Sequence, residues 1–335
     1  VMNWKNYLLA IASIGLLLSA CNKNDESNGI TGTAGEPTSL TISLKGNSVK
    51  NMGQPTQLQE NTIADFTVCV YNGISNILEK IETFDNSDFT RTINGLTTGP
   101  KKIVVIANKP GTYTLPVTGA NYSDLTSELF DLSTQTTSTN LLMSCDTTTT
   151  LTLADPNGPN LFEAKLRRVV AKVQLGSVTY SPEAAYTGTF TLDSVYIMKA
   201  RGEASVHAVT TGAPLYGGID ATASAAKSFL AEKTTLTATG DSTCYFYVFP
   251  NDNTGDNATL ITLVGTYDGT RMYYPFRVNY NAATQDGTFI KRNEHHVVNV
   301  TIKKPSSGVQ APEETVDPAS LEITVVPQNC IVMPV

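Results

Sequence analysis

The chain has 335 residues, of which 16% are charged, and its formal net charge is −7. This length exceeds what one hydrophobic core usually supports, so the sequence predicts two domains, with one large β-domain as the alternative. An acidic chain with so few charges lacks the clustered Lys and Arg that binding to nucleic acid or anionic lipid requires.

The first 21 residues have the pattern of an export signal peptide. Lys5 precedes an apolar run from Tyr7 to Leu18, and Leu18-Ser19-Ala20-Cys21 follows. This run is shorter than the roughly 20 apolar residues that span a bilayer as a helix. Leu-Ser-Ala-Cys fits a bacterial lipobox, which predicts lipidation of Cys21, with acyl chains such as palmitate, in an outer membrane lipoprotein precursor. The alternative is an ordinary signal peptide with an incidental cysteine. Residues 22–37 are predicted to be a flexible linker.

Short segments of alternating apolar and polar residues follow the linker. Leu40, Ile42 and Leu44 alternate with polar residues, which predicts a first strand with one buried face. Further strands are predicted at residues 66–70, 103–107, 169–175, 190–197, 274–280 and 298–302, with a bulge in 190–197 where the apolar phase slips. Cys244–Phe249 is apolar on both faces, which is typical of a central strand. Many short strands separated by turn residues predict a sandwich or a barrel.

Helix is scarce in the predicted fold. The best candidate is Ser123–Leu132, where Ser123 can cap the first turn. The turn residues of Asp155–Pro159 predict a boundary between an N-terminal β-sandwich at 38–158 and a C-terminal one at 159–335.

No pattern in the chain predicts a catalytic, cofactor or metal site. His295 and His296 are adjacent, so on a strand they point to opposite faces and cannot form one site; they are interpreted as exposed strand-edge residues. The cysteines after Cys21 stand alone without metal-ligand spacing, and Cys69 and Cys244 are predicted to be buried thiols. The sequence therefore predicts a protein that is not an enzyme and needs no cofactor. A glycan hydrolase stays an alternative, because the spacing of a carboxylate pair arises from the fold.

The carboxy-terminal tail, from about residue 309 to 335, returns to an apolar alternation after a disorder-prone spacer. Its candidate donor-strand residues are Leu321, Ile323, Val325, Ile331, Met333 and Val335. A tethered strand of this kind can pair with its own sheet or complete the sheet of a neighbour by β-augmentation. The second case requires an empty slot, which removal of a plug strand would create. The candidate plug is the first strand, and Lys45 and Lys50 are candidate cleavage sites, with plain loop lysines as the alternative.

Several motifs in their order carry a resemblance to a known family. They are Ile103–Asn108, Leu142–Ser144, Lys165–Val173, Tyr245–Asn251 and Lys291–Asn293. Together with the lipobox, they make nearly the whole chain similar to the FimA-type major fimbrial subunits of the Bacteroidales, which build type V pili.

The resemblance implies two transthyretin-like β-sandwich domains, proteolytic loss of the first strand, and donor-strand exchange into a fimbrium on the cell surface. The implied partners are other copies of this chain, related fimbrial subunits, a maturation protease and a host or bacterial receptor. No arginine precedes Arg91, so the early cut is expected at a lysine. The free tail favours a shaft subunit that contributes to adhesion. The alternatives are a fimbrial tip adhesin and a monomeric surface lipoprotein that binds glycan or host protein.

Overall fold

The computed structural model describes residues 35–44, 59–135, 138–153, 160–208, 215–216, 244–251, 258–278, 290–305 and 321–329. The predicted signal peptide, Cys21, Lys45, Lys50 and residues 330–335 lie outside these ranges. Within them, no helix is both long and apolar enough to cross a membrane. The regular secondary structure of the described residues is almost entirely strand, which confirms the predicted all-β class.

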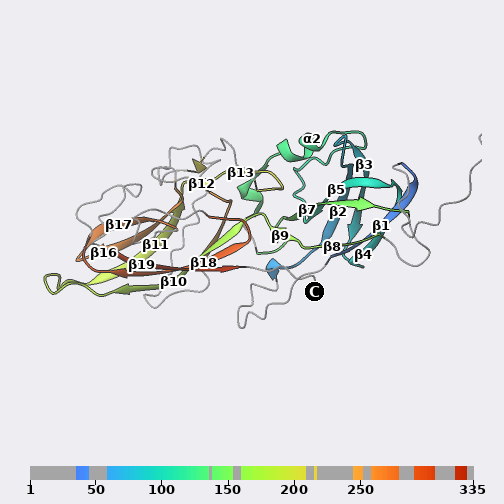
Figure 1. Cartoon of the computed structure of the whole chain (residues 1–335). Helices are drawn as coiled ribbons and strands as arrows, with labels where there is room; N and C mark the ends of the chain where they lie inside the picture. Colours follow the sequence, from blue (N-terminus) through green and yellow to red (C-terminus); the bar gives the residue numbers. More distant parts are fainter. Residues whose placement is uncertain are drawn as a thin grey trace, which may run out of the picture.

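The first sandwich, in the right half of Figure 1, packs a three-stranded sheet against a five-stranded sheet. The three-stranded sheet has the order β4-β1-β8, with bounds β1 (Pro37–Leu44), β4 (Thr90–Thr97) and β8 (Asn160–Ala164). The five-stranded sheet has the order β3-β2-β5-β7-β9, with bounds β2 (Asp65–Asn72), β3 (Leu78–Asp85), β5 (Gly99–Ala107), β7 (Met143–Leu151) and β9 (Arg167–Arg168).

The core of the first sandwich follows from the alternation of side chains along its strands. Leu40, Ile42 and Leu44 of β1 are all buried in it. On β5, Ile103 points into the same core, whereas Val104 belongs to a second apolar cluster on the opposite face of the sheet. The five-stranded sheet is therefore covered on both faces where β5 crosses it.

The second sandwich lies in the left half of Figure 1. One sheet has the order β15-β10-β18-β19, with bounds β10 (Ala171–Tyr180), β15 (Tyr245–Val248), β18 (Glu294–Ile302) and β19 (Leu321–Asn329). The other has the order β11-β16-β17, with bounds β11 (Phe190–Met198), β16 (Leu260–Tyr267) and β17 (Thr270–Arg277). The remaining short elements are β6 (Phe130–Asp131), a 3-10 helix (Leu132–Gln135), β12 (Ala200–Arg201), β13 (Glu203–Ala204) and β14 (Leu215–Tyr216).

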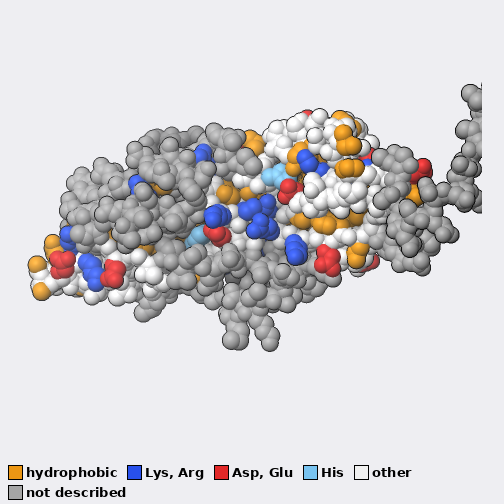
Figure 2. All heavy atoms as spheres, in the orientation of Figure 1, with side chains coloured by type: hydrophobic (Ala, Val, Ile, Leu, Met, Phe, Trp, Pro, Cys, Tyr) orange, Lys and Arg blue, Asp and Glu red, His pale blue; other side chains and the backbone are white. Residues whose placement is uncertain are grey.

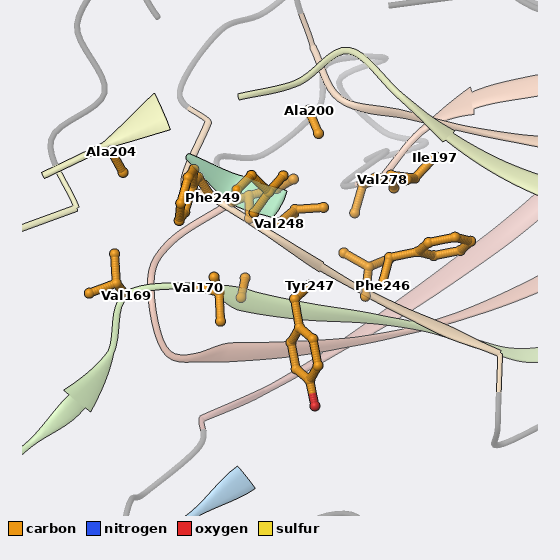
Figure 3. Close-up of a cluster of buried hydrophobic side chains, with 14 of the residues drawn as sticks. Val169, Val170, Ile197, Ala200, Ala204, Phe246, Tyr247, Val248, Phe249 and Val278 are labelled. Carbon is orange, nitrogen blue, oxygen red and sulfur yellow. The ribbon is translucent and has the colours of Figure 1, made fainter. Parts of the chain in front are cut away.

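The two sandwiches meet through a shared apolar cluster. β6 of the first half pairs with β13 of the second half. The rings of Phe130 and Phe249 are in edge contact there, with centroids 5.2 Å apart. Figure 3 shows the cluster around Val170, Val248 and Phe249, and Tyr247 extends its hydroxyl away from it. The core of the second sandwich therefore continues to the outer face of the first sandwich's five-stranded sheet.

The predicted helix at Ser123–Leu132 is only partly right. The helix α2 spans Tyr122–Ser127, and Asn121, not Ser123, is its N-cap, in a capping box with Asp124. It ends early because β6 follows at once and its backbone is needed to pair with β13.

Two strand predictions have different outcomes. The predicted bulge in β11 is confirmed by a register shift between Leu192 and Ser194 against β16. The interpretation of Cys244–Phe249 as a central strand is wrong, because β15 lies at the edge of its sheet. It is apolar on both faces because residues near Glu60 cover its outer face, as described below.

The predicted domain boundary at residues 158 and 159 stays a prediction. β8 follows this point in the sequence, yet it runs parallel to β1 in the first sandwich. β9 likewise pairs with β7 of that sandwich. The pairing therefore favours a boundary closer to residue 169, where the chain turns into β10.

Candidate assembly site

The predicted plug strand, β1, lies in the middle of its sheet. It pairs antiparallel with β4 and parallel with β8. Its inward side chains, Leu40, Ile42 and Leu44, are 1%, 0% and 4% exposed. If β1 were removed, a slot would open between β4 and β8. Its apolar sites would be those that Leu40, Ile42 and Leu44 now fill, one at every second residue. In the following sections, this space is called the β1 slot.

The beginning of the β1 slot is polar. The hydroxyl of Thr38 donates to the carbonyl of Thr152 at 2.7 Å. The side-chain amide of Asn160 donates to the Thr38 hydroxyl at 3.1 Å and to the Ser39 carbonyl at 2.9 Å. Asn160 therefore joins β8 to the first residues of β1. Among the described strands, β8 pairs with β1 alone, so it depends on whatever occupies the slot.

The opposite wall, β4, has supports that do not involve β1. The ammonium group of Lys101 on β5 is 2.6 Å from a Glu79 carboxylate oxygen on β3 and donates to the Thr97 hydroxyl of β4 at 2.8 Å. At the other end of β4, Arg91 pairs with Asp85 at 3.0 Å. These contacts tie β4 to the five-stranded sheet, so we expect it to keep its place if β1 is removed.

The predicted donor residues that the structure describes lie in the second sandwich, not beside this slot. Leu321, Ile323 and Val325 are in β19, which pairs antiparallel with β18 along nine residues, from Leu321 opposite Ile302 to Asn329 opposite Glu294. Leu321 and Ile323 are only half-buried there. Ile331, Met333 and Val335 lie outside the described residues. The structure therefore places the plug and the donor strand in different sandwiches of one chain.

A buried ionic cluster fixes the segment that follows the candidate cleavage sites. One carboxylate oxygen of Glu60 is 2.7 Å from the ammonium group of Lys172 and accepts a hydrogen bond from the Tyr247 hydroxyl at 2.7 Å. The Arg168 guanidinium is 3.5 Å from the other oxygen and also donates to the Asn61 side chain at 2.6 Å. Burial, with the Glu60 charge as a second cause, raises the pKa of Tyr247 well above its usual range. This group, from Glu60 to Tyr247, is called the Glu60 cluster below.

The Glu60 cluster joins the two sandwiches. Glu60, Arg168 and Lys172 are 3%, 3% and 6% exposed, although each carries a charge. Burial of charges is tolerated only where they are paired and hydrogen-bonded, as they are here. Figure 2 shows Lys and Arg side chains gathered over the middle of the protein, where the sandwiches meet.

A second polar contact at this junction is made by Arg292. Its guanidinium donates to the Arg168 carbonyl at 3.1 Å, and to the carbonyl and the hydroxyl of Ser144 at 3.2 and 3.0 Å. Burial, followed by the neighbouring Arg167 charge, lowers the pKa of Arg292 to about 10. The motif around Arg292 that carried the family resemblance is therefore a structural link between β7, β9 and the start of β18.

The histidines and cysteines singled out in the sequence, His295, His296, Cys69 and Cys244, lie within the two sandwiches. The prediction that His295 and His296 point to opposite faces is confirmed, since His295 contacts Gln174 and His296 contacts Glu294. The interpretation of both as exposed edge residues is wrong: His296 is 2% exposed, because β18 lies between β10 and β19. Burial, then the Lys172 charge, lowers the pKa of His295 to about 4. Cys69 and Cys244 are buried and outside any disulfide, as predicted, and burial raises the pKa of Cys69 to about 12.

The sequence did not single out the residues that hold the β1 slot and the Glu60 cluster together. Glu60 lies in the polar stretch Gln57–Asn61, which has no apolar period. Lys101 and Asn160 lie at the ends of strands, where polar residues are ordinary. A buried partner is a property of two segments, so no local pattern marks it.

The fold that carries this site is similar to that of several solved structures. A putative cell adhesion protein from Bacteroides eggerthii is 24% identical over 90% of this chain and 98% of its own, with a TM-score of 0.66. A fimbrilin from Porphyromonas gingivalis is 19% identical over 90% of this chain and 99% of its own, with a TM-score of 0.60. The tip fimbrial protein Mfa3 of the same organism is 14% identical, covers 88% of this chain and 99% of its own, and has a TM-score of 0.56. Among curated proteins, no sequence matches this chain. These likenesses show that the chain shares its fold with these proteins.

A family model also matches the sequence. Residues 38–189 match the model of the major fimbrial subunit protein (FimA) family. The match confirms the resemblance predicted above. It supports a pilus-related adhesion role at a cell-surface fimbrium, with other fimbrial subunits as partners. A structural subunit family also points to a protein that is not an enzyme.

Proposed function

We propose that this chain is a fimbrial shaft subunit, exported as a lipoprotein on Cys21 and polymerised by donor-strand exchange. A protease cuts after Lys45 or Lys50 and releases β1. The tail strand of a second copy then fills the β1 slot and joins the two subunits, so that repeated steps build a fibre that contributes to adhesion.

One observation carries the proposal. β1 is the first described strand of the chain, yet it lies between two other strands and all its inward apolar side chains are buried. A strand at the start of a chain can be removed by a single cut. Its removal would expose a slot that is lined by a hydrophobic core and has unpaired backbone groups on both walls.

The free energy of refilling the slot is large enough for a stable joint. Three fully buried apolar side chains contribute about 1.5 to 3 kcal/mol each, or on the order of 5 to 9 kcal/mol before costs. Backbone hydrogen bonds to β4 and β8 would fix the register and the direction of the incoming strand. Ordering the incoming strand offsets part of this gain. A donor with matching side chains is therefore favoured over an empty slot.

The Glu60 cluster supports the same proposal. Residue 60 lies after both candidate cleavage sites, so the cluster stays in the shortened chain. It holds the segment before β2 against the second sandwich through the contacts with Lys172 and Tyr247. The loss of β1 would then open the slot without releasing the rest of the first sandwich from its neighbour.

A disulfide that locks β19 to β18 tests donation. Thr301 and Glu322 are opposite each other in this ladder, and opposite residues of antiparallel strands lie within disulfide range. We expect subunits with Thr301→Cys and Glu322→Cys to form no detergent-resistant ladder when oxidised and to recover it when reduced. Glu322→Cys alone is the control and should polymerise under both conditions. A full ladder from the oxidised double variant would disprove donation by this strand.

A further inference from the structure

The plug strand and the first half of β19 have closely similar sequences. Pro37–Leu44 reads Pro-Thr-Ser-Leu-Thr-Ile-Ser-Leu, and Pro318–Val325 reads Pro-Ala-Ser-Leu-Glu-Ile-Thr-Val. The proline, the first serine, the first leucine and the isoleucine recur at the same positions. Where the residues differ, Glu322 replaces Thr41 and Thr324 replaces Ser43 at outward positions, and Val325 replaces Leu44 at an inward one. Ala319 replaces Thr38, so the hydroxyl that contacts Thr152 and Asn160 at the beginning of the β1 slot has no counterpart. The likeness is therefore strongest from the first leucine onward.

In the described segment Leu321–Val325, the first two apolar side chains are less buried on β19 than the matching side chains are in the β1 slot. Leu321 and Ile323 are half-buried on β19, which is the last strand of its sheet. The matching positions on β1, Leu40 and Ile42, are 1% and 0% exposed. Burial of apolar surface is favourable in proportion to the area removed from water. The same side chains would thus lose more exposed apolar surface in the slot than they do on β18.

The last apolar residues of the tail do not fit the slot in this way. If Ile331 took the place of Leu40, Pro334 would take the place of Ser43. Ser43 has a strand on each side, opposite Thr90 of β4 and Glu163 of β8. Proline has no backbone N–H and is excluded from strands that are paired on both sides. The two parts of the candidate donor tail are therefore not equivalent.

We propose that Leu321–Val325 of a second copy of this chain occupies the β1 slot in the register of the plug. Leu321 takes the site of Leu40, Ile323 that of Ile42 and Val325 that of Leu44. The donor runs in the direction of β1, antiparallel to β4 and parallel to β8. The inference rests on the proposed function, and it identifies the segment, the register and the direction of the exchange.

This register brings Glu322 to the outward position of Thr41. On β1, Thr41 is opposite Thr92 of β4, and their hydroxyl oxygens are 3.0 Å apart. A residue that replaces Thr41 is therefore within side-chain contact of residue 92. In the same register, Thr324 would stand opposite Thr90, one step further along the strand.

Cysteine cross-linking between two copies tests the register. One copy carries Thr92→Cys and the other Glu322→Cys, both with Cys145→Ala and Cys330→Ala so that these two native cysteines cannot form the cross-link. We expect a disulfide-linked dimer from the mixed polymer after boiling without reductant. Two variants of the second copy are matched controls: Thr324→Cys, shifted by one pair, and Val332→Cys, at the place of Thr41 if the last residues were the donor. Neither should give the dimer.

The outcomes separate this inference from the function on which it rests. Two outcomes would overturn the proposed register: a ladder without the Glu322→Cys dimer, or a dimer through Val332→Cys. Neither would contradict the proposal that the subunits polymerise. Absence of a ladder from the unmodified protein overturns both. As a second measurement, Ile323→Asp should abolish the ladder while the monomer stays folded, because the site of Ile42 is closed to water. Met333→Asp should leave the ladder in place, and a ladder that survives Ile323→Asp would contradict the assignment.

Discussion

Among single residues, Glu60 has the most unusual environment. Its carboxylate is nearly inaccessible to water, and two cations and a tyrosine hydroxyl surround it. A buried ion pair contributes little net stability compared with apolar packing, but the loss of one partner leaves a charge uncompensated. We therefore expect the cluster to favour one relative position of the two sandwiches over others.

Glu60→Gln should show this effect. The variant keeps the shape of the side chain but leaves Lys172 and Arg168 buried without their counter-charge, so we expect the free energy of unfolding to fall by about 3 to 5 kcal/mol. Chemical denaturation followed by circular dichroism measures it. The control is Glu82→Gln, whose ion pair with Lys80 is half-exposed and should contribute less than about 1 kcal/mol. Equal effects of the two substitutions would refute the role assigned to Glu60.

Among the strands, position in the sheet depends on neighbours that the strand's own sequence does not show. β15 has the composition of a central strand but lies at an edge, because the Glu60 segment covers it. β1 has the alternation of a strand with one wet face and lies in the middle of its sheet. Periodicity reports which faces of a strand are buried, and it does not report which strands lie beside it.

The bulged strand β11 gives a prediction at this level. A Cβ atom at Gly265 of β16 would lie 2.3 Å from the Phe190 ring and 2.6 Å from the Thr191 carbonyl oxygen. Gly265→Ala should therefore push β11 away and lower the free energy of unfolding by about 1 to 3 kcal/mol. Thermal unfolding measures this. The control Gly111→Ala has no atom within 4 Å of the new methyl group and should be nearly neutral. An unchanged melting temperature for Gly265→Ala would show that β11 and β16 are not packed this closely.

In the entire protein, β1 and the junction between the sandwiches are built from different residues. β1 contributes side chains only to the core of the first sandwich. The junction with the second sandwich is built by residues from Glu60 onward, through the Glu60 cluster and Arg292. If β1 is removed as proposed, we expect the change to be confined to one sheet and the junction to stay intact.

Removal of the candidate cleavage sites should block assembly. In a Lys45→Gln and Lys50→Gln double variant, a lysine-specific cut between β1 and β2 near these positions is prevented, so the plug stays and the slot stays filled. We expect monomers only in detergent extracts, against a ladder for the unsubstituted protein. Lys80→Gln, on the exposed side of β3, is the control and should polymerise normally. A ladder from the double variant, with β1 still present by amino-terminal sequencing, would show that assembly does not need the cut.

The sequence predicted the positions of most strands, but it did not predict the contacts that hold the β1 slot and the Glu60 cluster together. The alternation of Leu40, Ile42 and Leu44 was enough to place a strand with a buried face, and the phase slip in β11 was enough to place its bulge. The contacts of Glu60 with Lys172 and of Asn160 with Thr38 join segments more than 100 residues apart in the chain. No local period encodes such contacts.

The sequence by itself determined the all-β class, the buried faces of most strands and the likeness to fimbrial subunits, because alternation and short motifs are local properties of the chain. Only the tertiary structure decided that β1 is a central strand, that β19 lies at the edge of the other sandwich, and that buried charges join the two halves. Strand order and charge pairing depend on which distant segments come together, and that is settled by the packing of the complete chain.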